Sequence, residues 1–244
     1  MTNEFDNIQY SPIRNYPYEQ WFQEVHYNGK ELNEDEKKEF LQRVNETIFT
    51  YSDGLPLLKK TLEQIKDLHD EFHEAYRVVI SVSQFALITM IDSMVISKYF
   101  ILADQDYDKR FMRGKMKVIL NEGFKKLYGF EERSRQKSEW NRLVPILKLF
   151  PENIQNQYKH LSSLLEEHSK SSSWWKDERD LETHLDAGKL YASRCEDVVE
   201  SMVMLDSLKL FRTLRAVNYF LTNMHVCFLN SLVYKYRRGE LKKE

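Results

Sequence analysis

The sequence predicts an all-α protein, a helical bundle with long antiparallel helices and an irregular N-terminal arm. Glycine and proline are scarce, with 7 and 5 in 244 residues, whereas a chain rich in strands needs a turn about every eight to twelve residues. Apolar residues instead recur at intervals of three and four over long stretches, which is the spacing of one helix face. No internal repeat of about 20–50 residues is found, so a solenoid is excluded.

Composition is that of an ordinary globular chain, with 42% hydrophobic and 30% charged residues. The net charge of −2 excludes a generally basic nucleic-acid binder but leaves room for a local basic surface. Cys195 and Cys227 lie among apolar residues of helical pattern, so we expect buried free thiols in a reducing, cytoplasmic compartment. The N-terminus is acidic and lacks an apolar core, so no signal peptide is expected.

Residues 1–54 are predicted to form the N-terminal arm and a first helix. Residues 1–32 have an irregular pattern but many aromatic side chains, which favours an arm laid over a core because disordered tails are poor in aromatics. The first helix is expected to begin after Asn33, a good N-cap followed by acidic residues, and to end at Ser52. Residues 55–244 are predicted to form one continuous helical bundle.

Capping residues and helix breakers divide this bundle. A second helix is expected to begin near Pro56 and either to continue unbroken to Leu102 or to bend near His73. A third is expected to start at 104–106 and to stop at Gly129. The later elements are a kinked segment between two prolines, a helix, and one or two helices free of glycine and proline: Pro145 to Pro151, Ile154 to His168, and Lys189 to Lys235.

The most apolar stretch runs from Val78 to Ala103 and is interrupted by Gln84, Asp92 and Lys98. Its longest uncharged run, Val78 to Ile91, is shorter than the ~20 residues that a membrane span needs. We therefore expect the buried central helix of the bundle and no membrane association. A buried carboxylate requires a partner, so Asp92 is expected to have one.

Charge is unevenly distributed along the chain. Residues 1–76 carry 8 Lys/Arg against 16 Asp/Glu, whereas residues 98–148 carry 13 against 7. One explanation is a solvated basic helix face that pairs with the acidic N-terminal region. The other is a surface for an anionic partner.

His69-Asp70-Glu71-Phe72-His73 places two histidines four residues apart, the spacing of a zinc-binding helix. Asp70 stands where the general-base glutamate of such a motif belongs, and no third ligand is evident. The alternative is a solvated helix face. The sequence has no Glu-x-x-His pair for a di-iron bundle, no glycine-rich phosphate loop and no Gly-x-Ser-x-Gly elbow, so neither a metal nor a cofactor is expected.

A polar segment beginning at Trp174-Trp175 interrupts the helical pattern after a serine-rich loop. Within it, Arg179-Asp180-Leu181-Glu182-Thr183-His184 resembles the motif of the HEPN superfamily, which has an arginine, a polar residue beside it, and a histidine four to six positions after the arginine. HEPN proteins are small all-α bundles whose motif lies at a turn before a late helix. The resemblance would cover roughly residues 75–235, and residues 1–60 have no counterpart in that family.

The resemblance implies metal-independent RNA cleavage, in which the 2′-hydroxyl attacks the adjacent phosphorus and a cyclic phosphate is left. His184 would be the general acid/base, Arg179 would stabilise charge on the phosphoryl oxygens, and Asp180 would orient one of them. Two copies of the motif face each other in the family, so a homodimer is implied. Trp174 and Trp175 would pack the loop on the bundle or stack on bases.

Two functional hypotheses follow. The first is a HEPN-like bacterial endoribonuclease of toxin–antitoxin or phage-defence type, or an inactive relative, with RNA as substrate. The second is a non-enzymatic helical protein for interaction or assembly, whose partner is another protein. In the second, Arg179 forms a helix-start ion pair with Glu182 or Asp186, and His184 is a surface residue.

Overall fold

The computed structural model describes residues 14–22, 32–171, 195 and 200–237, and in these ranges the chain forms helices and turns without a strand. The predicted all-α bundle is therefore confirmed. The described elements, in chain order, are α1 (Glu19–Phe22), α2 (Glu34–Ser52), α3 (Gly54–Gln64), α4 (Glu71–Leu102), α5 (Asp106–Leu127), α6 (Glu132–Arg135), the 3-10 helix η2 (Asn141–Leu149), α7 (Glu152–Ser171) and α10 (Glu200–Arg237).

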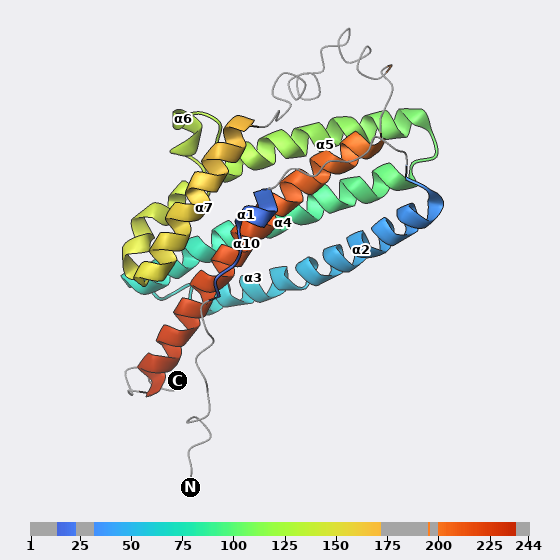
Figure 1. Cartoon of the computed structure of the whole chain (residues 1–244). Helices are drawn as coiled ribbons and strands as arrows, with labels where there is room; N and C mark the ends of the chain where they lie inside the picture. The colour runs from blue at the N-terminus through green and yellow to red at the C-terminus, as the bar shows by residue number, and fades with distance from the viewer. Residues whose placement is uncertain (1–13, 23–31, 172–194, 196–199, 238–244) are drawn as a thin grey trace.

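Helix α4 is the centre of the bundle. It contacts α2, α3, α5, α10 and η2. Figure 1 shows α2 and α5 running alongside α4, while α10 packs obliquely against α4 and α5. The main core joins side chains from α4, α5, α7 and α10, including Ile80, Met90, Phe124, Leu161 and Phe220, all fully buried. Burial of these side chains is the main source of stability.

Half of α4 is buried, 16 of its 32 residues, although the sequence favoured burial over most of its surface. Within the described residues it is the one helix long and apolar enough to cross a membrane, and 56% of its most apolar stretch is buried inside the protein. Core helices of soluble proteins can have the same length and composition.

Local sequence signals set the ends of two helices as predicted. The Asn33 side chain accepts hydrogen bonds from the backbone of Asp35 and Glu36, and the Glu36 carboxylate accepts one from the Asn33 N–H at 2.8 Å. This reciprocal arrangement is a capping box. After α5, Gly129 has φ +88°, a conformation that side-chain-bearing residues rarely adopt.

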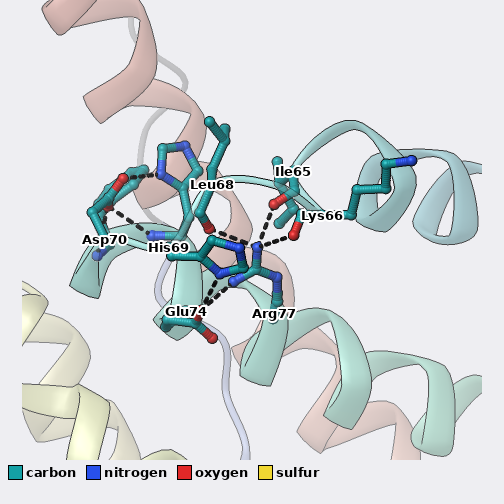
Figure 2. Close-up of polar contacts among 9 residues, drawn as sticks. Ile65, Lys66, Leu68, His69, Asp70, Glu74 and Arg77 are labelled. Carbon is teal, nitrogen blue, oxygen red and sulfur yellow. Dashed lines mark hydrogen bonds and ion pairs between the residues drawn. The ribbon is translucent and has the colours of Figure 1, made fainter.

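The helix does not continue unbroken from α3 into α4, because α3 ends at Gln64 and α4 begins at Glu71. Asp70 caps α4 by accepting from the backbone N–H groups of Phe72 and His73 at 3.0 and 3.1 Å. Arg77 on the first turns of α4 reaches back toward α3, and its guanidinium donates to the carbonyl oxygens of residues 65, 66 and 68 (Figure 2). It also pairs with Glu74 at 2.5 Å. These carbonyl groups lie in the turn that follows α3, and Arg77 donates hydrogen bonds to them from the next helix.

The segment at residues 14–22 packs on α7 and α10, and its described part matches an arm laid over a core. The Asn223 side chain pairs with both backbone groups of Arg14: its oxygen accepts from the N–H at 3.1 Å and its nitrogen donates to the carbonyl at 2.7 Å. Tyr16 stacks on Tyr219 with ring centroids 4.4 Å apart. Tyr18 is 2% exposed. Backbone pairing and aromatic burial together fix this segment.

His225 on α10 is partly buried against α4. The Ser83 hydroxyl donates to the Val79 carbonyl and lies 2.9 Å from His225 Nε2, so the imidazole donates from Nε2 to the Ser83 oxygen. Burial lowers the pKa of His225 to about 4. Burial, followed by the charge of Lys209, lowers the pKa of His168 to about 4 as well. Both rings are neutral in the folded protein at neutral pH.

Replacing Arg77 with Met should lower the free energy of unfolding by about 1.5–3 kcal/mol, because hydrogen bonds from a charged donor to the carbonyls in the turn after α3 are lost. Chemical denaturation followed by circular dichroism measures this. Arg43→Met removes an ion pair with Glu39 on α2 whose side chains are 74% and 62% exposed, and should cost less than about 1 kcal/mol. Equal losses in the two variants would contradict the role of Arg77.

Stability should fall as pH drops from about 6.5 toward 4. The pKa of His225 is lower in the folded state than its ordinary value of 6.5, so below 6.5 the unfolded chain binds a proton that the folded protein excludes, at a cost of up to about 3 kcal/mol. His225→Gln, which keeps a donor for Ser83, should make this slope shallower. His69→Gln, on a side chain 74% exposed, should leave the slope unchanged in denaturation curves measured at pH 5, 6 and 7.5.

Candidate functional site

The catalytic residues expected from the sequence, Arg179, Asp180 and His184, lie outside the described residues, as do Trp174 and Trp175. Their relative placement therefore stays a prediction.

The histidine pair does not form the helical motif that its spacing suggested. Helix α4 begins at Glu71, so His69 precedes the helix and Asp70 is its N-cap. His69 Nδ1 lies 3.4 Å from Glu74 Oε1 and His73 Nδ1 lies 2.5 Å from Asp70 Oδ2 (Figure 2 labels His69, Asp70 and Glu74). The hydrogen bond from His73 is the largest effect that lowers the pKa of Asp70. Within the described ranges, no three His, Cys, Asp or Glu side chains gather as a metal site would require.

The two cysteines differ in environment. Cys227 is a buried thiol, as expected, and burial raises its pKa to about 11. Cys195 is exposed, so the expectation that both are buried was wrong for this residue. Apolar neighbours in sequence do not say which side of a helix a residue occupies, and only its angular position decides burial.

A groove of about 780 Å³ lies on the surface between α4 and α5. Aromatic and aliphatic side chains from both helices form most of its lining, with charged side chains among them: Phe85, Thr89, Asp92, Ile96 and Tyr99 from α4, and Phe111, Met112, Lys115, Val118, Ile119, Glu122, Gly123 and Lys126 from α5. The volume lies within the range of ligand pockets, about 300–1,000 Å³. Its volume and mostly apolar lining make the groove a candidate binding site.

Close approach of the two helices depends on Gly123. A Cβ atom built there would lie 2.9 Å from Thr89 Cγ2 and 3.5 Å from a methyl group of Leu210 on α10. The first distance is too short for a carbon contact, so a side chain at this position would push α5 away from α4. The absent side chain therefore sets the spacing of the two helices that line the groove.

Helix α4 also presents a stripe of exposed and half-buried residues, of which Phe85, Asp92 and Tyr99 line the groove. Residues spaced alternately by three and four positions form it: Phe85, Ile88, Asp92, Val95, Tyr99 and Leu102. Ile88, Tyr99 and Leu102 are 47%, 53% and 49% exposed. This is the a/d spacing of a helix that packs against another helix. The stripe lies beside the face that α4 buries in the core.

Asp92 is exposed rather than buried, so the expected burial was wrong. The partner that burial would have required is absent from the described residues. Within them, Asp92 makes no hydrogen bond or ion pair. Partial burial among its apolar neighbours raises its pKa, because desolvation disfavours the charged form. A carboxylate near the middle of an apolar groove would therefore gain from a cation brought by a partner.

The other charged residues of the groove differ in whether they already have a partner. Lys126 lies 3.3 Å from Glu139, and Glu122 lies 3.6 Å from Lys125. The Lys115 ammonium instead lies over an aromatic ring of its own helix, 5.0 Å from the centroid, and has no ion pair within the described part of the chain. The groove thus offers one carboxylate and one ammonium to a partner.

The groove was not predicted from the sequence, although α4 carries a signal for it. The apolar residues of α4 surround the helix instead of forming one stripe, which indicates more apolar surface than one core-facing side needs. Which part stays exposed depends on how many neighbours the helix has, and this is a property of the tertiary structure.

Comparison with protein-family models, with curated proteins and with solved structures finds no match to this chain.

Proposed function

We propose that this protein is a non-enzymatic helical interaction protein that binds an amphipathic helix in the groove between α4 and α5. The observation that carries the proposal is the groove itself, with mostly apolar walls that include Tyr99, 53% exposed, and with Ile88 and Leu102 about half exposed on the same stripe of α4. Contiguous exposed apolar surface on a soluble protein marks interaction sites. Helix-in-groove binding is a recurrent mode of such recognition.

The dimensions of the groove fit a helix. Its lining on α4 runs from Phe85 to Tyr99, a length of about 21 Å at 1.5 Å per residue. A bound helix of about four turns would fill this length. Phe85, Ile96 and Met112 can contact its apolar face, while Asp92 and Lys115 can pair with charged residues at its edge.

Site-specific photo-crosslinking tests whether the groove is occupied. A benzoylphenylalanine in place of Tyr99, 53% exposed in the groove, should give a discrete crosslink in cells, and mass spectrometry should map it to an amphipathic helix. The same probe at Phe49 on α2, 68% exposed and outside the groove, should not. A crosslink from Tyr99 to residues 172–194 of the same chain, or equal products from both positions, would contradict the proposal.

The second candidate function is the metal-independent endoribonuclease. Arg179, Asp180 and His184 in the HEPN-like order are the observation that favours it, and a cytoplasmic bacterial defence or toxin role would follow from that resemblance. The two candidate functions differ in what they require. The nuclease needs the Arg179 and His184 side chains at one phosphate, whereas helix binding needs only the groove.

If the nuclease hypothesis holds, purified protein should cleave single-stranded RNA in EDTA, because neither proton transfer by His184 nor charge stabilisation by Arg179 requires a metal. Products should carry a cyclic phosphate, and DNA should survive because it lacks the 2′-hydroxyl. His184→Ala and Arg179→Ala should each reduce the rate at least about 100-fold, while His69→Ala keeps it. Cleavage that persists in both motif variants would reject this assignment.

A further inference from the structure

We propose that the helix bound in the groove belongs to a second copy of this chain, in a two-fold symmetric dimer in which Asp92 of each copy pairs with Lys115 of the other. This inference rests on the proposed interaction function and names its partner. It places α4 of one copy against α5 of the second, so that the two apolar faces cover each other.

Charge complementarity favours a second copy over an acidic or a basic partner. Asp92 and Lys115 both line the groove, and neither has an ion pair within the described part of the protein. A basic partner would satisfy Asp92 and repel Lys115, and an acidic partner would do the reverse. In a two-fold symmetric dimer, Asp92 of the first copy pairs with Lys115 of the second, and symmetry repeats the pair between Lys115 of the first copy and Asp92 of the second. Both charges of each copy are then satisfied.

The position of Asp92 also suits a paired helix. It lies midway between Phe85 and Tyr99 on the exposed stripe, seven residues from each. A single polar residue inside an apolar stripe fixes the register of packed helices, because any other register leaves it buried without a partner. The same carboxylate disfavours insertion of this stripe into the apolar part of a lipid bilayer, where a charge is costly.

The size of the face sets the expected strength. The face formed by α4 and α5 is about 21 Å long and, being two helices wide, about 20 Å across, so it covers on the order of 400 Å² in projection. Standard interfaces bury about 800 Å² per partner. We therefore expect a reversible dimer that forms in the micromolar range and dissociates on dilution.

Sedimentation velocity on the full chain, from about 1 to 200 μM, tests this arrangement through charge exchange. Wild-type protein should shift from monomer to dimer. Asp92→Lys and Lys115→Asp should each weaken the dimer about 100-fold, because like charges then meet twice across the two-fold axis. An equimolar mixture of these two variants should dimerise again, since both contacts become Lys–Asp pairs in the mixed dimer. The double variant should likewise recover.

Two controls separate this result from misfolding and from surface charge in general. Circular dichroism should show wild-type helicity for each variant, because both side chains lie at the surface. Lys60→Asp, on the exposed side of α3, should leave the dimer unchanged.

Other outcomes overturn the inference. A monomer at every concentration removes it, yet a Tyr99 crosslink to the helix of another protein would keep the interaction function. A dimer insensitive to both single variants is joined through another face, and the inference fails. Loss of the dimer in both variants without recovery on mixing also rejects the proposed pairing.

Discussion

The apolar circumference of α4 is the constraint on which the fold depends. A helix apolar on all sides needs neighbours on all sides to be stable in water. Contacts with α2, α3, α5, α10 and η2 cover only part of it, and Ile88, Tyr99 and Leu102 remain about half exposed. The hydrophobic core and the candidate binding groove are thus two parts of one helix surface, one covered by the chain and the other left open.

Polar contacts hold the elements around this helix at defined positions. Arg77 ties the turn after α3 to the start of α4, and Asn223 ties the segment at Arg14 to α10. In both cases a side chain satisfies backbone groups that have no partner in regular structure, which explains why these polar residues are needed beside an apolar core. Apolar burial supplies most of the free energy, and these contacts select one arrangement of the helices.

Much of the fold could be predicted from local sequence signals, because capping and glycine conformation are local effects. Asn33 and Gly129 mark helix ends in the sequence as they do in the structure. Asp70 was harder to interpret: between two histidines it suggested a metal-binding helix, but its short carboxylate caps α4 instead. Asp92 and Cys195 were misplaced because burial depends on neighbouring helices, which spacing along one chain does not reveal. The groove was missed for the same reason.

Pairing of two copies does not by itself distinguish the two functional hypotheses, because the HEPN resemblance also implies a dimer. What distinguishes them is the residue at the contact. The nuclease requires His184 and Arg179 of both copies to meet at one phosphate, whereas the assembly hypothesis requires Asp92 of one copy to meet Lys115 of the other.

A carboxylate in an apolar contact adds little affinity, because removing it from water costs about as much as its ion pair returns. Its contribution is to specificity, since it penalises every partner and register that lacks a matching cation. A groove built only to bind tightly would carry an apolar residue at this position, so in the proposed dimer Asp92 serves selection of one partner rather than maximal affinity.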